Sequence, residues 1–214
     1  MHLFVTGSNS KLRSSELTTH LTGRHNKVEL YSFPFAEYAA MSGVELRSLS
    51  TKSKALRKKA LRGYLMDGEF TELQGERNKR GYIEALLNSI IKNDIARRFR
   101  LRQVLRRMAD CLAGNFCQEF VATDLAKQFG VSNHNYSELI LLPKDAFLLP
   151  GIPKFCYKSL ERVRNEKVYV MVVAFISECR GTFCTENTEW RQENVVYVEQ
   201  LRRYRPEYAG VFSL

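Results

Sequence analysis

Residues 120–132 read FVATDLAKQFGVS, and this stretch decides the fold that we expect for the middle of the chain. Residues 124–129 can form a short helix capped by Thr123, and a turn at Gly130 leads to a second helix over 133–142. An alanine inside the first helix lets the second approach closely, and glycine tolerates a positive φ in the turn. The pattern favours a helix-turn-helix of the DNA-binding kind, although helix–glycine–helix also occurs in plain bundles.

In that arrangement the second helix presents polar side chains to a groove of DNA. The DNA-binding candidates are Asn133, His134, Asn135, Ser137 and Lys144. Asparagine can pair with adenine through two hydrogen bonds, whereas histidine and serine are weaker readers. Pro143 removes a backbone donor and disfavours a helical Leu142, so either the helix stops near Leu141 or the unit is distorted.

Charge points to the same kind of partner. The chain of 214 residues has 33 Lys and Arg against 23 Asp and Glu, a net charge of +10. Such a surplus suits nucleic acid or another anionic surface. No run approaches the roughly 18 apolar residues of a membrane span, and the N-terminus lacks a signal-peptide pattern. We therefore expect a cytoplasmic protein that binds nucleic acid and has no membrane partner.

Cysteine and histidine give no sign of a metal site. The five cysteines form no C-x-x-C pair, and the four histidines are scattered along the chain. Zinc sites place such ligands at short, paired spacings. We expect free thiols in a reducing compartment and no bound metal.

The flanking segments alternate between strand and helix patterns. In the N-terminal part a strand over 2–6, a helix over 8–24 and a strand over 28–33 are expected. A polar, basic helix covers 52–62, and a turn is expected over 63–70. The beginning of the chain therefore reads as a piece of an α/β sheet followed by helices.

Further along, apolar residues at helical spacing predict a helix over 82–98, and a basic amphipathic helix continues to about residue 112. Residues 168–175, VYVMVVAF, are continuous and β-branched, which predicts a buried strand. A helix is expected over 188–203, where apolar residues again recur at helical spacing.

The whole chain resembles the middle of a bacterial AAA-superfamily ATPase-like protein. That family joins a P-loop ATPase core to a winged-helix domain and a C-terminal restriction-nuclease-like domain of unknown function. The stretches that carry the resemblance are FVTGSNSKLRSSELTTHLTGR, YSFPFAEY, YLMDGEF, GYIEALLNSIIKNDIARRFRLR, FVATDLAKQFGVS, KDAFLL, IPKFCYKSLERVRNEKVYV and TENTEWRQENVVYVEQLRR.

The resemblance implies the fold class: an α/β fragment of an AAA ATPase core, a mainly α winged-helix or helix-turn-helix region, and the start of an α/β nuclease-like domain. The implied division is residues 1–40 for the end of the ATPase core, 41–98 for a helical lid-like region, 99–158 for the winged helix and 159–214 for the beginning of the nuclease-like domain.

The resemblance also implies roles for three residues. Asn9 matches a nucleotide-sensing position, and Arg24 matches an arginine that reaches a neighbouring subunit's nucleotide, where it would neutralise charge on the phosphoryl group. A surface arginine after a helix is the alternative reading of Arg24. Glu193 matches an acidic residue of the nuclease-like domain, and its further carboxylates are not found in this chain.

The intact family uses ATP and Mg²⁺, but no G-x-x-x-x-G-K-[ST] occurs in these 214 residues. We therefore expect a truncated ATPase-like protein that needs no cofactor of its own, is inactive by itself and retains a DNA-binding winged helix. Two alternatives stay open. The chain could be a stand-alone basic DNA-binding module, or an accessory subunit that supplies Arg24 in trans to an oligomer with intact relatives.

Overall fold

The computed structural model describes residues 31–68, 70–90, 102–132, 134–136, 139–140, 149–153, 165–178 and 187–204. Its elements are α2 (Phe35–Met41), α3 (Thr51–Asp67), the 3-10 helix η2 (Thr71–Gln74), α4 (Lys79–Ile90), α5 (Arg102–Gly114), β1 (Glu119–Val121), α6 (Ala122–Phe129), β2 (Gly151–Pro153), β3 (Asn165–Val168), α9 (Ala174–Glu178) and α10 (Thr188–Arg203). Residues 134–136 and 139–140 are also helical. None of the helices in this part of the chain is both long and apolar enough to cross a membrane.

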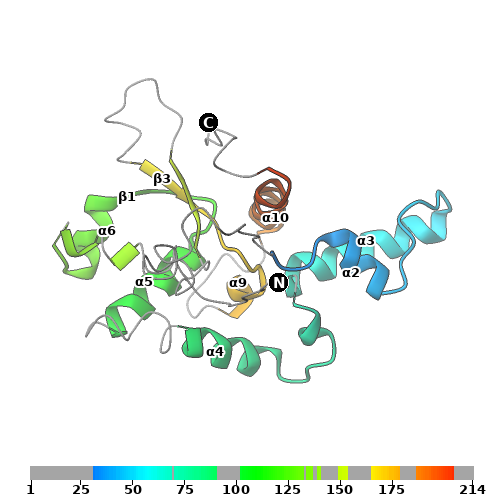
Figure 1. Cartoon of the computed structure of the whole chain (residues 1–214), viewed down its shortest axis with the longest axis horizontal. Helices are drawn as coiled ribbons and strands as arrows, with labels where there is room; N and C mark the ends of the chain where they lie inside the picture. The colour runs from blue at the N-terminus through cyan, green and yellow to red at the C-terminus, as the bar shows by residue number, and fades with distance from the viewer. Residues whose placement is uncertain are drawn as a thin grey trace, which may run out of the picture.

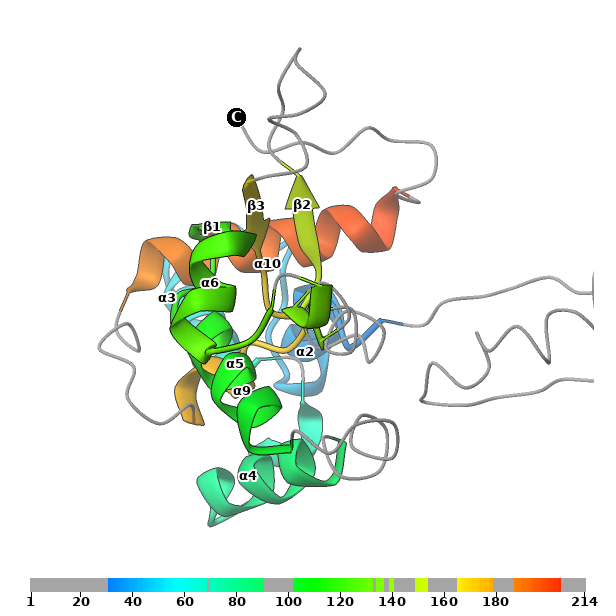
Figure 2. The same cartoon turned by 90° about the vertical axis from the view of Figure 1, so that its left-hand side faces the viewer.

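The three strands form one small antiparallel sheet in the order β1-β3-β2. Glu119 lies opposite Lys167, and Gly151 lies opposite Val168, so β3 is the central strand. Helices α5 and α6 lie on one side of this sheet and α10 lies on the other (Figures 1 and 2). The sheet is therefore sandwiched between the helix-turn-helix candidate and the C-terminal helix.

One hydrophobic core joins these layers. Its most deeply buried side chains come from α5 and the turn after it, α6, the residues after β3, and α10, and they include Met108, Leu112, Phe116, Ala126, Val170, Ile176 and Val198. Phe116 meets the ring of Trp190 edge-on, with 5.9 Å between centroids. Burial of this contiguous apolar surface is the main stabilising contribution to the fold.

Two predicted helices agree closely with the structure. The helix over 188–203 is confirmed as α10, and the Asn187 side chain caps it by accepting the Trp190 N–H at 3.2 Å. The short helix over 124–129 is confirmed as α6, which begins two residues earlier, at Ala122. Val121 precedes it as the N-cap and no side chain caps the helix, so the expected capping role of Thr123 is wrong.

The expected turn over 63–70 is wrong in its first half. Helix α3 continues to Asp67, and the chain reverses only at Gly68, which has φ +69° and ψ −154°. Tyr64 and Leu65 stay helical because both are buried against the rest of the molecule. A turn was expected at Gly63, but burial of the next two side chains outweighs the low helix propensity of that single glycine.

The remaining predicted helices and strands lie only partly within the described residues. The described part of the helix over 82–98 is helical within α4, and the basic helix ending near residue 112 is α5. Residues 31–33 are not in a strand, and the rest of the strand over 28–33 lies outside the described residues. The strand over 2–6 and the helix over 8–24 also lie outside them. The domain boundaries and the fold class stay predictions.

The predicted strand over 168–175 is wrong. β3 ends at Val168, and α9 begins at Ala174. Between them the backbone N–H and C=O of Val170 are bonded by the side chain of Asn194 on α10, at 2.8 and 2.7 Å. A continuous apolar run shows that a segment is buried but not what satisfies its backbone, and here a side chain replaces a strand partner.

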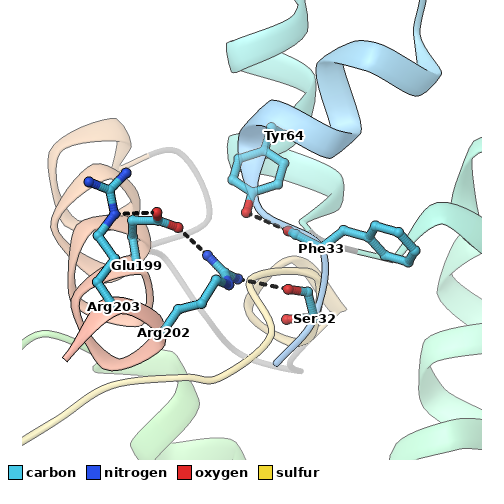
Figure 3. Close-up of polar contacts among 6 residues, drawn as sticks. All are labelled: Ser32, Phe33, Tyr64, Glu199, Arg202 and Arg203. Atoms are coloured by element: carbon cyan, nitrogen blue, oxygen red, sulfur yellow. Dashed lines mark hydrogen bonds and ion pairs between the residues drawn. The ribbon is translucent and has the colours of Figure 1, made fainter. Parts of the chain in front are cut away.

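Polar contacts fasten the segment before α2 to α3 and α10 (Figure 3). The Tyr64 hydroxyl donates to the Phe33 carbonyl at 2.9 Å, and Arg202 Nη2 donates to the Ser32 carbonyl at 2.8 Å. Glu199 accepts from Arg202 and, at 2.7 Å, from Arg203 Nε. Burial by itself would raise the Glu199 pKa, but the hydrogen bonds from Arg203 and Arg202 hold that pKa below its ordinary value. The C-terminal helix thus holds the backbone of residues far away in sequence.

Candidate nucleic-acid interface

The turn after α6 is built as the sequence requires. Gly130 adopts the left-handed conformation (φ +66°, ψ 31°) and donates its N–H to the Lys127 carbonyl at 3.1 Å. The Val131 N–H returns to the Ala126 carbonyl at 3.0 Å, which closes the end of the helix in the manner of a Schellman motif. Glycine is favoured here because a side chain at positive φ is strained. The expected turn at Gly130 is confirmed.

The next helical segment starts immediately after this turn. The Ser132 hydroxyl accepts the Asn135 N–H at 3.2 Å, and the Ser132 carbonyl accepts the Tyr136 N–H at 2.8 Å. Ser132 is therefore the N-cap, a role that serine commonly takes. Residues 134–136 are helical, as expected for the beginning of the second helix.

The inner surfaces of the two helical segments meet in the core. Ala126 on α6 is fully buried (0% exposed), and Leu139 and Ile140 from the second segment are buried in the same cluster. Tyr136 is also buried there, and this burial raises the pKa of its hydroxyl. The small side chain of the buried Ala126 leaves room for the close approach of the second segment that the sequence pattern predicts.

The outer surface carries the polar side chains. His134 and Asn135 are exposed, and so is Lys127, three residues before the glycine. Arg107 on α5 places its guanidinium 5.9 Å from the centre of the Phe129 ring, beside the end of α6. Asn133, Ser137 and Lys144 lie outside the described residues, as do Asn9 and Arg24. The structure therefore brings two of the five predicted DNA-binding residues to one exposed helix start.

Lys127 was not among the predicted binding residues. Only its position marks it as a candidate. It lies on α6, in the turn of helix that precedes Gly130, where a cation would flank the start of the second segment. Because it is exposed there, it can contact a ligand that approaches this start.

Glu193 occupies a different place, on the other side of the sheet. Its carboxylate accepts the Tyr169 hydroxyl at 2.9 Å and pairs with the Lys167 ammonium at 2.5 Å. The Tyr169 ring stacks on Tyr197, with 4.0 Å between centroids. Burial, and then the hydrogen bond to Glu193, raise the pKa of Tyr169. These contacts tie α10 to the chain around the end of β3, beside the Asn194 contacts with Val170.

Cys117 also contacts both β3 and α10. It has a positive φ of 61°, its N–H donates to the Val168 carbonyl at 2.8 Å, and its thiol lies 3.3 Å from the Trp190 carbonyl. Burial, with Glu193 nearby, raises the pKa of this thiol. Within the described residues, no three His, Cys, Asp or Glu side chains come together as a group that could hold a metal ion.

The beginning of the chain is similar to a known class of domain. Residues 1–39 match the family model of an AAA domain, and the chain is AAA-like. Most of that match lies outside the described residues, and its last part includes Ser32, Phe33 and α2. The segment held by Tyr64 and Arg202 in Figure 3 is therefore the end of the AAA-like part.

The second match is longer and gives the family. Residues 58–181, more than half of the chain, match the model described as a domain of unknown function (DUF8612), and the chain belongs to this family. The match begins inside α3 and continues through the sheet to the residues after α9.

Two curated relatives are similar over nearly the whole chain. Uncharacterized protein MJ1544 of Methanocaldococcus jannaschii is 29% identical over 230 residues, which covers 99% of this chain and 49% of the relative. An uncharacterized protein of Haemophilus influenzae is 27% identical over 210 residues, which covers 94% and 51%. The chain thus spans about half the length of the curated relatives it matches. No solved structure matches it.

Proposed function

We propose that residues 102–168 of this AAA-like chain are a winged-helix unit that binds double-stranded DNA. The observation that carries the proposal is the left-handed turn at Gly130 between two helical segments whose buried residues share one core. The order of elements supports it as well: α5, β1, α6, the second segment, then the antiparallel strands β2 and β3. A helix-turn-helix followed by such a β-ribbon is the arrangement of a winged helix.

The recognition surface in this proposal is the beginning of the second segment. Helix-turn-helix proteins contact base edges with residues at the N-terminal end of the recognition helix. His134 and Asn135 are exposed at that end, and Asn135 can hydrogen-bond both edge groups of an adenine. Lys127 is exposed on α6 and Arg107 lies beside the Phe129 ring at the end of that helix, and both can contact phosphates near the turn.

A double substitution tests the recognition surface. In His134→Ala/Asn135→Ala the affinity for a preferred duplex should fall about tenfold, because losing one good base contact costs about 1–3 kcal/mol, and the preference among sequences should weaken. Fluorescence anisotropy with labelled duplexes of about 20 base pairs, drawn from a selected and a scrambled sequence, measures both effects.

Gln192→Ala is the matched control, since Gln192 is exposed on α10, on the other side of the sheet. If the double variant binds both duplexes as tightly as the Gln192→Ala control, the second segment is not the recognition surface and the proposal fails.

The nucleotide chemistry of the AAA-like part is proposed to be incomplete in these 214 residues. A P-loop supplies backbone N–H groups and a lysine to the phosphates, and a hydroxyl to Mg²⁺, and no such motif is present. Asn9 and Arg24 keep their predicted roles beside a nucleotide held by other residues, in the whole protein or in a partner subunit. Glu193 stays a predicted nuclease-like carboxylate, with a structural role already visible in its contacts with Tyr169 and Lys167.

The 214-residue chain should therefore neither bind ATP at micromolar concentration nor hydrolyse it. Isothermal titration with Mg²⁺-ATP measures the first property and phosphate release measures the second. Saturable binding in the micromolar range would show that the chain builds a complete nucleotide site without a P-loop.

A further inference from the structure

Helix α3 is the most strongly basic element among the described residues. Its seventeen residues read TKSKALRKKALRGYLMD and contain six Lys or Arg and a single acidic residue, Asp67, at the very end. The net +5 of this helix equals half of the +10 of the whole chain. Together with α2 it forms a helical hairpin that extends away from the sheet and α10 (Figure 1). We call this hairpin, residues 35–67, the arm.

The basic side chains gather on one surface of α3. Lys54, Lys58 and Arg62 are spaced i, i+4 and i+8, which places them in a line along the helix. At about 100° of rotation per residue, Lys59 lies about 60° and Lys52 about 80° from Arg62, on the side away from Lys54, so the five cations spread over a little under half of the helix circumference. The opposite surface holds Ala60 and Tyr64, which are buried, and Leu65, which follows the line of cations near the end of the helix, is buried at the base of the arm. We call the five exposed cations, Lys52, Lys54, Lys58, Lys59 and Arg62, the basic face.

These five cations differ from the sixth. Arg57 lies nearer the buried surface, and its guanidinium donates to the carbonyl of Leu46, so it holds the loop between α2 and α3. No carboxylate among the described residues forms an ion pair with any residue of the basic face. The five charges are thus available to a partner, whereas Arg57 stabilises the arm.

The arrangement is costly for an isolated helix. Like charges at i, i+4, such as Lys54 with Lys58 and Lys58 with Arg62, destabilise a helix. Surfaces that serve only solubility intersperse both signs of charge. A run from Lys52 to Arg62 without one carboxylate is instead what a polyanionic partner would stabilise.

The base of the arm is fixed to the body of the molecule. The buried Tyr64 donates its hydroxyl to the Phe33 carbonyl, and the buried Arg191 Nη1 donates to the Leu65 carbonyl at 2.9 Å. The Ser177 hydroxyl donates to the next carbonyl, of Met66, at 2.9 Å. Three hydrogen bonds from separate segments therefore hold the last turns of α3, so the basic face is presented in one direction relative to the body.

We propose that the basic face of α3 binds the phosphate backbone of double-stranded DNA without regard to sequence, as a second contact at the opposite end of the molecule from the helix-turn-helix (Figure 1). From Lys52 to Arg62 the helix rises about 15 Å. Over that length one DNA strand presents about four phosphates, which five lysine and arginine side chains can match. The choice of duplex DNA as the partner rests on the proposed function, while the basic face itself does not.

The test is the salt dependence of duplex binding by the full chain. In Lys54→Gln/Lys58→Gln/Arg62→Gln the slope of log K against log salt concentration should become shallower by about 3, because each lost phosphate contact removes about 0.9 from it. Affinity should fall by a similar factor for the selected and the scrambled duplex. Glutamine keeps a high helix propensity, and circular dichroism would verify that α3 stays folded.

The matched control is Lys54→Arg/Lys58→Arg/Arg62→Lys, which keeps every charge and should keep the wild-type slope. An unchanged slope in the glutamine variant overturns the proposal. The proposal is also overturned if the wild-type chain binds vesicles of anionic lipid but not the duplex. The His134→Ala/Asn135→Ala variant separates the two proposals. If it binds normally while the glutamine variant loses its slope, the helix-turn-helix proposal fails and the basic face stands; the reverse result leaves the helix-turn-helix and removes the basic face.

Discussion

Replacing Asn194 with alanine should lower the free energy of unfolding by about 3 kcal/mol. Asn194 is fully buried, and its side chain makes both backbone hydrogen bonds of Val170, one as acceptor at 2.8 Å and one as donor at 2.7 Å. Alanine would leave a buried N–H and a buried C=O without these bonds, each at a cost of about 1–3 kcal/mol. Since whole domains are stable by only about 5–15 kcal/mol, this single side chain accounts for a large share.

Urea unfolding followed by circular dichroism measures this loss, and hydrogen exchange at the Val170 amide localises it. That amide should be protected in the wild type and exchange much faster in the variant. Gln192→Ala, on the exposed surface of the same helix, should change stability by no more than about 0.5 kcal/mol. Equal stability of the two variants would mean that the Asn194 contacts contribute nothing net.

Gly68→Ala should destabilise the fold by about 3 kcal/mol as well, for a different reason. With φ +69° and ψ −154°, Gly68 lies in a region that is essentially restricted to glycine, where other residues pay about 1–3 kcal/mol. A Cβ there would also lie 2.9 Å from the backbone nitrogen of Ala174, at the beginning of α9. That neighbour is main chain and cannot move without shifting the helix, so strain and overlap add.

Two other glycines separate these causes. Gly43 has a similar φ of +67° but nothing within 4 Å of an added Cβ, so Gly43→Ala should show the conformational strain alone, about 1 kcal/mol. Gly75 has neither a positive φ nor a neighbour within that distance, and Gly75→Ala should be nearly neutral. Urea midpoints should rank Gly68→Ala lowest, then Gly43→Ala, then Gly75→Ala. A Gly68→Ala variant as stable as Gly75→Ala would rule out the tight approach of α3 to α9.

Tertiary contacts around Asn194 and before Gly68 explain two errors in the sequence-based predictions. The strand expected over 168–175 ends at Val168 because Asn194, more than twenty residues away, satisfies the Val170 backbone. The turn expected over 63–70 is delayed to Gly68 because Tyr64 and Leu65 are buried by segments that are distant in sequence. In each case the competing interaction comes from tertiary packing, which local patterns do not contain.

The turn and the helix start of the candidate interface were predicted correctly from the sequence. The turn at Gly130 and the beginning of a helix after Ser132 depend on nearest neighbours: a glycine that accepts positive φ, and a serine that caps the following N–H groups. Lys127 was missed because one exposed lysine on a helix carries no signal of its own. Its meaning came from lying beside Gly130 and the second segment.

The basic face of α3 was likewise predicted only in part from the sequence. The run of Lys and Arg from Lys52 to Arg62 is plain in the sequence, where it is typical of a solvated helix surface. Only the folded molecule separates Arg57, which bonds the Leu46 carbonyl, from five cations that share the opposite surface of an arm held at its base by Tyr64 and Arg191.

The sequence by itself determined the basic charge, the helix Thr188–Arg203, the glycine turn after α6 and the likeness to AAA proteins, because composition, short-range periodicity and capping are local properties of the chain. The tertiary structure alone decided where β3 stops, that Asn194 and Arg191 are buried, and which cations face outward together. Those features arise when segments far apart in sequence satisfy one another's backbone groups and exclude water, and no single segment encodes its partner.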